Sequence, residues 1–234
     1  LQQEGALPVN LKFVFEGEEE TGSIHLVPFI EAYKERLEDA DVVLVSDTAM
    51  FGKDVPSITY GLRGLAYVEV TLTGPNRDLH SGNYGGGVEN PINALATMID
   101  RLHDDDHRIA IPGFYDDVRD LTEEERRTYR ELPFDEKAWM EEIGLEAVRH
   151  EKGYTLLECL SARPTLDANG IWGGYTGEGA KTVLPAEAHA KISMRLVPDQ
   201  RAEDIYDKLE AYLEAITPPT MTLEFRRLHG GKAV

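Results

Sequence analysis

The chain has 234 residues and a formal net charge of −19, because 43 acidic side chains outnumber 24 basic ones. This acidic excess argues against nucleic acid or an anionic membrane as a partner, since both require a basic surface. No apolar run is long enough to span a bilayer. The single cysteine, Cys159, excludes an internal disulfide and is typical of a reducing compartment. We therefore expect a cytoplasmic protein that binds neither nucleic acid nor a membrane.

The first 48 residues carry the pattern of a βαβ unit. An apolar run at 9–15 predicts a buried strand, and apolar residues at helical spacing predict a helix at about 25–38. A second apolar run at 41–48 predicts another strand. Two strands joined through a helix in this way are parallel, with a right-handed crossover.

Carboxylates follow both predicted strands. Glu18–Glu20 come directly after the first strand, and Asp47 lies at the end of the second. Because the carboxyl ends of parallel strands meet at one edge of a sheet, we expect these side chains to converge there. Converging carboxylates repel one another unless a cation compensates their charge, and a divalent metal ion supplies that charge. The alternative is a solvated acidic turn, which also suits a helix N-terminus.

From Gly61–Gly64 onward the pattern changes to that of an α+β domain. Residues 66–73 alternate apolar and polar, which predicts a half-exposed antiparallel strand, and Asn90-Pro91 predicts the start of a helix. The remaining elements are strands at 167–173, 187–196 and 220–226 and a helix at about 200–216. Together they predict a four-stranded antiparallel sheet with helices on one face. The first helix is expected to face the core with Ile92, Leu95, Ala96, Ile99 and Leu102.

Residues 103–160 are acidic and helix-prone, and we expect a helical insertion without chemistry. The run His103-Asp104-Asp105-Asp106-His107 in this segment resembles the spacing of metal ligands. It falls at the end of a surface helix, with no buried strand to hold it rigid, so we interpret it as a solvated charge run.

Three residues beyond the acidic turn have a functional interpretation beside an ordinary one. A lone loop histidine such as His80 is usually a solvated surface residue, but the glycines around it let a ligand approach closely. Arg195 projects from the polar face of its strand, either as a surface charge or as a bidentate clamp for a carboxylate. Thr182 can donate a hydrogen bond from a Gly-rich loop, as many loop residues do.

Several motifs occur in the order found in one enzyme family, and the match covers nearly the whole chain. They are Glu16-Gly17-Glu18-Glu19-Glu20-Thr21-Gly22-Ser23, Ser46-Asp47, Ile58-Thr59-Tyr60-Gly61-Leu62-Arg63-Gly64, Asp78-Leu79-His80-Ser81-Gly82, Gly179-Ala180-Lys181-Thr182-Val183-Leu184-Pro185, Met194-Arg195-Leu196-Val197-Pro198 and His229-Gly230-Gly231-Lys232. With them the chain resembles the aminoacylase/carboxypeptidase family of co-catalytic zinc peptidases, and most closely its cytosolic nonspecific dipeptidase and carnosinase branch.

The resemblance implies an α/β fold in which a catalytic α/β domain is interrupted by an α+β lid domain that also dimerises. Residues 1–61 would be part of the catalytic domain, with the parallel βαβ unit. Residues 62–228 would be the lid, with its helical insertion at about 103–160. Residues 229–234 would return to the catalytic domain.

The resemblance also implies a hydrolase of dipeptides or short peptides. Glu19 would be the general base, while Glu20 and Asp47 would bind one each of two divalent metal ions, with zinc expected and manganese as the alternative. A hydroxide that bridges the two ions would attack the peptide carbonyl.

Further roles implied by the resemblance concern a homodimer formed through the lid. His80 would reach the active site of the partner subunit and polarise the scissile carbonyl. Arg195 would hold the carboxylate of the substrate in its own subunit. Thr182, from the lid of the partner, and His229 would contact the substrate.

The chain lacks part of the family's pattern. An upstream His-x-Asp ligand and a bridging aspartate would precede Leu1, which is not a methionine, and a final histidine ligand would follow Val234. We therefore expect an internal piece of a longer enzyme, and a piece that binds metal poorly and is inactive alone. The alternatives are an N-acyl-amino-acid deacylase or desuccinylase of the same fold and, outside the enzymes, an isolated dimerisation module.

Overall fold

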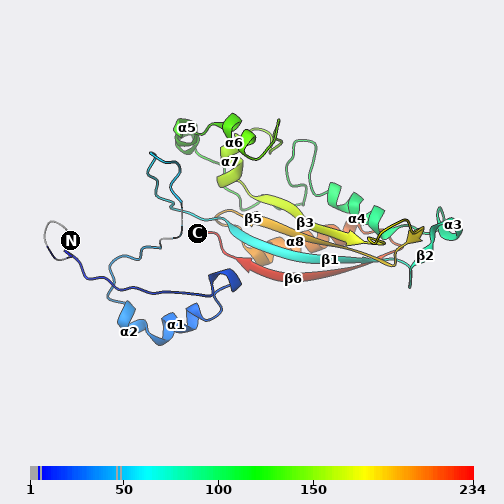
Figure 1. The fold of residues 1–234 in the computed structure, drawn as a ribbon, viewed down its shortest axis with the longest axis horizontal. Helices are drawn as coiled ribbons and strands as arrows, with labels where there is room; N and C mark the ends of the chain where they lie inside the picture. Colours follow the sequence, from blue (N-terminus) through cyan, green and yellow to red (C-terminus); the bar gives the residue numbers. More distant parts are fainter. Residues whose placement is uncertain (1–4, 6, 46, 48) are drawn as a thin grey trace. The chain divides into compact units, whose positions relative to one another are not determined.

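The computed structural model describes residues 5, 7–45, 47 and 49–234, and it divides the chain into two compact units. The first unit is Leu1–Ile58 and the second is Thr59–Val234. Figure 1 shows the helices and strands of each unit.

The described residues of the first unit contain three short helical segments. The acidic turn forms a 3₁₀ helix, η1, at Glu19–Thr21, and Gly22 ends it in the left-handed conformation with φ of 92°. The helix expected at about 25–38 is present as α1, Leu26–Ala32, and α2, Lys34–Leu37, which meet at Tyr33. The helical part of the predicted βαβ unit is therefore confirmed.

The two strands expected in the first unit are wrong for the residues that the structure describes. Residues 9–15 and the described part of 41–48 belong to no strand, and Ser46 and Thr48 lie outside the described residues. Phe15 is 92% exposed and Leu44 is 87% exposed. An apolar strand of a parallel sheet is stable only between neighbouring strands and under helices on both faces. Without these, two such segments do not form a parallel ladder.

The second unit is built on the predicted four-stranded antiparallel sheet, and the prediction is confirmed. Its strands are β1 at Gly64–Thr73, β3 at Thr165–Gly173, β5 at Glu187–Leu196 and β6 at Thr222–Gly231. Their order is β3-β5-β1-β6, and all three pairs are antiparallel. A separate two-stranded sheet joins β2, Leu79–His80, to β4, Val183–Leu184. Strand β6 extends beyond the predicted end at residue 226 and keeps His229 opposite Tyr67.

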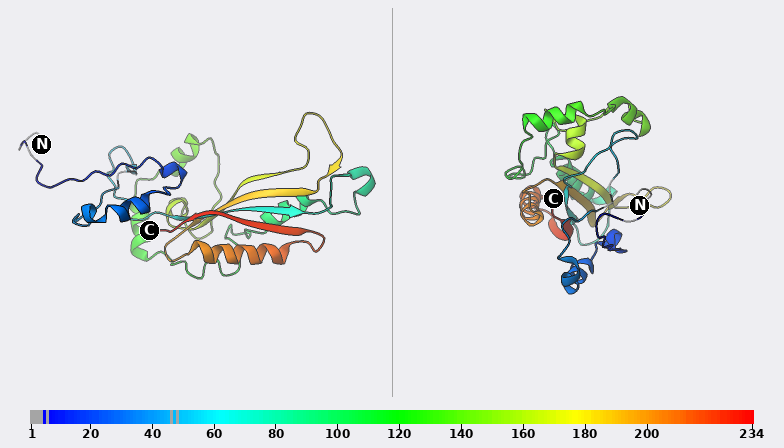
Figure 2. Two further views of the ribbon diagram at one scale, coloured as in Figure 1. Left: turned by 90° about the horizontal axis from the view of Figure 1, so that it is seen from below. Right: turned by 90° about the vertical axis from the view of Figure 1, so that its left-hand side faces the viewer.

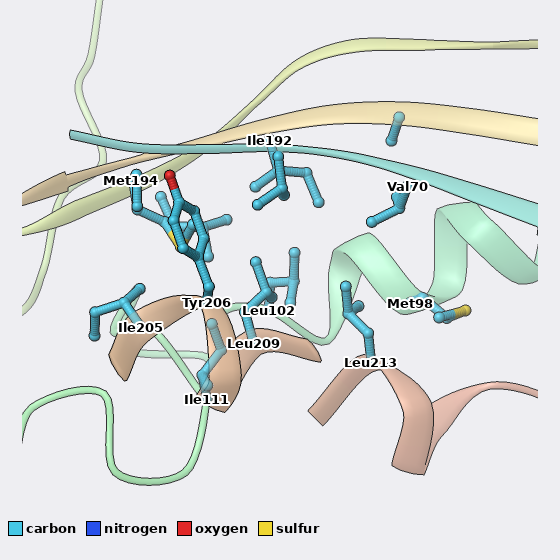
Figure 3. Packing of buried hydrophobic residues seen from close by; sticks show 14 of the residues in the cluster. Val70, Met98, Leu102, Ile111, Ile192, Met194, Ile205, Tyr206, Leu209 and Leu213 are labelled. Atoms are coloured by element: carbon cyan, nitrogen blue, oxygen red, sulfur yellow. The ribbon is translucent and has the colours of Figure 1, made fainter. Parts of the chain in front are cut away.

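Two helices cover one face of this sheet, as the sequence predicts. Helix α4, Pro91–Asp100, packs against β5, and α8, Ala202–Ile216, packs against β1 and β6 (Figure 2). Alternate residues of β1 and β5 point toward these helices and are buried, while those between them lie on the opposite face, which we call the open face. The core side chains drawn and labelled in Figure 3 are Val70, Met98, Leu102, Ile111, Ile192, Met194, Ile205, Tyr206, Leu209 and Leu213.

Helix α4 begins where the sequence predicts, and four of the five residues expected to face the core do so. The side chain of Asn90 accepts a hydrogen bond of 2.9 Å from the backbone N–H of Ile92, and Pro91 occupies the first turn. Ala94 and Met98 are buried, whereas Ala96, which was expected in the core, is exposed. Leu95 and Leu102 are also buried, and Ile92 and Ile99 pack against the core, so the predicted face is confirmed except at Ala96.

The segment at about 103–160 contains helices, as the sequence predicts. It contains α5 at Glu123–Glu131, α6 at Glu136–Glu142 and α7 at Leu156–Ser161. These helices lie near the end of the sheet where β1 begins, whereas α3, Ser81–Tyr84, lies beyond the end of β1 at Thr73 (Figure 1). Among the described residues, no helix has the length and apolar character needed to cross a membrane.

Candidate functional site

His80 is held in a defined orientation by hydrogen bonds to both of its ring nitrogens. It is the second residue of β2, where it pairs with Val183 of β4. The backbone N–H of Gly82 donates to His80 Nδ1 at 3.0 Å, and His80 Nε2 lies 3.1 Å from Thr182 Oγ1. Because Nδ1 accepts a hydrogen bond, a neutral His80 carries its proton on Nε2. Nε2 is then the donor, and it donates to Thr182 Oγ1.

The backbone around His80 is fixed by the neighbouring sheet segment. The N–H of Ser81 donates to the carbonyl of Thr182 at 3.0 Å, and the Asp78 carboxylate accepts from the N–H of Ala186 at 3.0 Å. A Cβ at Gly82 would lie 2.8 Å from His80 Cε1, so only glycine permits this close approach of ring and backbone. The Gly-rich loop predicted around His80 is thus a short strand followed by a helix turn.

Arg195 and His229 lie at the other end of the same unit. Arg195 is exposed on the open face of β5, where its Cα pairs with Leu65 of β1 and with Thr165 of β3. His229 is exposed on β6 opposite Tyr67, and the two rings meet edge to face with centroids 5.1 Å apart.

A β-bulge between Tyr67 and Val68 fixes the position of His229. A bulge interrupts the ladder and leaves backbone groups without strand partners. The hydroxyl of Tyr206, from α8, satisfies two of them, because it accepts from Tyr67 N at 3.3 Å and donates to the carbonyl of His229 at 2.7 Å. Tyr206 is 3% exposed, so this bridge is part of the core.

The predicted substrate residues therefore fall into two groups within one chain. His80 and Thr182 are in contact beyond the Thr73 end of β1, whereas Arg195 pairs with Leu65 near its Gly64 end. Leu65 and Thr73 are separated by about 27 Å at the usual rise of an antiparallel strand. A dipeptide is much shorter than this distance, so the two groups of one chain do not meet on one small substrate.

The predicted metal and base residues lie in the first unit. Glu19 and Glu20 are in η1, and both are exposed, as is Asp47. Neighbouring Glu18 pairs instead with His25, whose Nδ1 lies 2.7 Å from Glu18 Oε2. The described residues include no group of three or more His, Cys, Asp and Glu side chains that could hold a metal ion. The donors that the structure describes therefore do not form a complete metal site by themselves.

A pocket that the sequence reasoning missed lies at the Gly64 end of the sheet, with a volume of about 530 Å³. Arg63, Arg163 and Arg195 are among its lining residues. Arg163 is 2% exposed, and its Nε and Nη2 donate to the carboxylate of Glu151 at 2.9 and 2.8 Å. Arg63 was noticed only as part of a motif, and nothing in the spacing of Glu151 and Arg163 indicates that they pair.

The His103–His107 segment also belongs to this pocket, so its interpretation as a solvated charge run is wrong for the two histidines. Their rings stack with centroids 5.0 Å apart, and both are half-buried, whereas the three aspartates between them are exposed. Burial, together with the charge of His107, lowers the pKa of His103 below its ordinary value. The isolated bridge between His103 and Ile109, which sequence spacing does not reveal, closes this turn.

Burial perturbs two further groups of the pocket wall. It raises the pKa of the Cys159 thiol to about 11 and that of Tyr115 to about 12. A thiol with such a raised pKa is protonated at neutral pH, so Cys159 is not activated as a nucleophile.

The family model for a peptidase dimerisation domain, M20_dimer, matches residues 60–221. The chain is 36% identical over 228 residues to the Cys-Gly metallodipeptidase dug1 of Schizosaccharomyces pombe, covering 96% of this chain and 48% of that protein. The chain spans about half the length of the curated relatives it matches.

Two solved structures are similar to the chain over nearly its whole length. The crystal structure of human carnosine dipeptidase 1 has a TM-score of 0.79 at 31% identity, over 93% of this chain and 47% of that one. An M20 family metallo-carboxypeptidase from Sulfolobus solfataricus has a TM-score of 0.75 at 36% identity, over 90% of this chain and 48% of that one.

Proposed function

Because the chain belongs to the M20 peptidase dimerisation domain family, we propose that the protein that contains it is a metal-dependent dipeptidase. Two kinds of support exist. The relatives named above include a metallodipeptidase and a carnosine dipeptidase. The second unit also places a polar donor pair and a cationic group at opposite ends of one sheet.

We propose that the active unit is a homodimer in which two copies supply different residues to one substrate. The observation that carries this proposal is the separation, within one chain, of the His80–Thr182 pair from Arg195. In a two-fold dimer the His80 end of one copy can meet the Arg195 end of the other, and the two-fold axis repeats the contact. Each dimer then has two equivalent composite sites.

The geometry of His80 suits a hydrogen-bond donor to the scissile carbonyl. Its Nε2 carries the proton because Nδ1 accepts from Gly82, and the exposed Thr182 hydroxyl is an exchangeable partner until substrate arrives. A prepositioned donor of this kind stabilises the developing oxyanion by about 3 kcal/mol. Arg195 binds the terminal carboxylate of the peptide through its planar guanidinium. His229, held by Tyr206, lies near the same end and contacts the substrate.

The residues of the acidic turn complete the proposal. Glu19 acts as the general base, while Glu20 and Asp47 each provide one ligand to a pair of divalent ions, zinc being the first candidate and manganese the second. Since the described residues form no complete metal site, we expect this chain alone to bind metal weakly and to be inactive.

We also propose that 62–228 acts as the lid and dimerisation domain, and that the protein works in the cytoplasm. The first proposal is supported by the match of the family model to 60–221. The second is supported by the single free cysteine, which suits a reducing compartment.

The experiment that tests the function is an assay of the full-length protein with zinc or manganese on dipeptides and, in parallel, on N-acetyl amino acids. We expect hydrolysis of dipeptides, loss of turnover with retained metal in Glu19→Gln, and loss of metal in Glu20→Ala. Turnover of the N-acetyl amino acids alone would replace the dipeptidase assignment with a deacylase. Full activity of Glu19→Gln would contradict the assigned base.

A further inference from the structure

The side chain of Arg63 reaches toward β3 just past the end of β5, two positions beyond Arg195 in the register. Arg63 directly precedes β1, and its Nη1 donates to the carbonyl oxygen of Arg163 at 3.3 Å, just before β3 begins. Strand β5 lies between β1 and β3 in the sheet, and Arg195 is the β5 residue that pairs with both Leu65 and Thr165. Arg63 and Arg195 are close enough for the charge of Arg195 to act on Arg63, and both residues line the pocket.

The positive charges of this pocket exceed its negative charges. Its lining includes the guanidiniums of Arg63, Arg149, Arg163 and Arg195 but only two carboxylates, Glu151 and Asp167. The carboxylate of Glu151 is already bound to Arg163 at 2.8 Å. Neither Arg63 nor Arg195 has a carboxylate within ion-pair distance among the residues that the structure describes. In a chain with a net charge of −19, such a local excess of positive charge is unusual.

Two neighbouring guanidiniums repel each other, and partial burial increases the cost of their charge. The pKa of Arg63 is lowered from its ordinary value, first by burial and then by the charge of Arg195, while Asp167 opposes the shift. An oxyanion between the two guanidiniums removes the repulsion and satisfies donors on both planar forks. The pocket volume of about 530 Å³ accommodates a small organic anion.

We propose that Arg63 and Arg195 jointly bind one carboxylate, so that Arg63 is a second residue that selects substrates with a free terminal carboxylate. This inference rests on the proposed function for the identity of the anion. It extends that function because the proposed function gives the carboxylate to Arg195 of β5 alone. Arg63, which directly precedes β1, is the added residue. The remaining wall, which includes Trp139, Leu156 and Leu160, offers apolar surface to the side chain beside the carboxylate.

The test is a calorimetric titration of the metal-free full-length protein, in which no turnover disturbs the binding. Glycylglycine and its C-terminal amide are the two probes, and inorganic phosphate is the third. We expect the wild-type protein to bind the acid more tightly than the amide. We expect Arg63→Met to weaken binding of the acid about 10- to 100-fold, as for loss of a charge-assisted hydrogen-bonding group. Binding of the amide should change less than about threefold.

Two further variants separate charge from geometry and from folding. Arg63→Lys keeps the charge but loses the planar fork, so it should restore only part of the affinity. Arg201→Met removes an exposed guanidinium that pairs with Asp204 and does not line the pocket, and it should bind both probes like the wild type. Thermal unfolding midpoints of all variants show whether each one folds.

The outcomes distinguish this inference from the proposed function. Equal affinity of the acid for wild type and Arg63→Met, or no measurable binding of the acid by the wild type, overturns the role of Arg63. The role of Arg63 is also overturned if Arg63→Met weakens the binding of phosphate but not the binding of the acid. The site would then serve a different anion. If the probes bind as predicted but the full-length protein does not hydrolyse dipeptides, the dipeptidase proposal is overturned and the carboxylate site is retained.

Discussion

His80 and Thr182 are 102 positions apart in the sequence, yet His80 Nε2 and Thr182 Oγ1 lie within 3.1 Å. The contact forms because β2 pairs with β4 and because Ser81 N–H donates to the Thr182 carbonyl. With Nδ1 occupied by the N–H of Gly82, the proton of a neutral His80 is directed outward from Nε2. The fold thus presents a histidine donor whose orientation is fixed before substrate arrives.

We predict that Thr182→Val lowers kcat/KM of the full-length protein about 5- to 10-fold, the value of one neutral hydrogen bond. The isosteric side chain removes the hydroxyl that orients the His80 ring. Because both residues are exposed, the thermal unfolding midpoint should hardly change. Thr176→Val, in the exposed part of the same connection, is the matched control and should keep wild-type kinetics. Equal kinetics for both variants would remove the positioning role of Thr182.

We predict that Gly82→Ala lowers kcat at least about tenfold, since catalysis is sensitive to displacements of about 1 Å. The added Cβ would meet His80 Cε1 at 2.8 Å, so the ring must move. Gly87→Ala is the control in the same segment, because the nearest atom there, the carbonyl oxygen of Tyr84, is 3.7 Å away. Steady-state kinetics of the two variants decide the matter, and an unchanged kcat for Gly82→Ala would show that the ring position is unimportant.

Tyr206→Phe should destabilise the second unit by about 1–3 kcal/mol, because it leaves two backbone groups at the β-bulge without a partner. The hydroxyl bridges Tyr67 N and the carbonyl of His229, and the residue is buried. The measurement is urea unfolding followed by circular dichroism, with Tyr84→Phe at an exposed site as control. A change of less than about 0.5 kcal/mol would mean that water replaces the hydroxyl at little cost.

Cys159 should react slowly with iodoacetamide. Its pKa is raised to about 11 by burial, so the thiolate fraction at pH 8 is several hundred times smaller than for an ordinary thiol of pKa about 8.5. The rate should rise about tenfold for each pH unit above 8 and should level off only near pH 11. The same protein in urea is the control, and equal rates in the folded and unfolded states would contradict the assigned burial.

The sequence predicted the second unit well because strands such as β1 and β5 alternate strictly. In β5 the predicted bounds 187–196 agree with the observed bounds Glu187–Leu196. The strands of the first unit failed for a physical reason, since apolar runs such as 41–45 form strands only beside other strands. The contacts of Arg163 with Glu151, and the stacking of His103 on His107, depend on tertiary packing that no local pattern contains.

In the candidate site, too, the sequence predicted residues but not the contacts that depend on tertiary packing. Residue types and motif order singled out His80, Thr182, Arg195 and His229, but the sequence did not reveal the proton position on His80. Nor did it reveal the Tyr206 bridge behind His229, because a β-bulge is set by the pairing of β1 with β6. The roles of Glu19, Glu20 and Asp47 stay predictions.

The most direct test of the central claim, that two copies share one substrate, is the activity of heterodimers purified through two different affinity tags. A heterodimer of a His80→Ala subunit with an Arg195→Met subunit contains one complete composite site, so it should show about half of the wild-type activity. A heterodimer of a wild-type subunit with a His80→Ala/Arg195→Met subunit contains none and should be nearly inactive. The reverse pattern, with activity only in the second heterodimer, would show that both residues act within one subunit and would contradict the account.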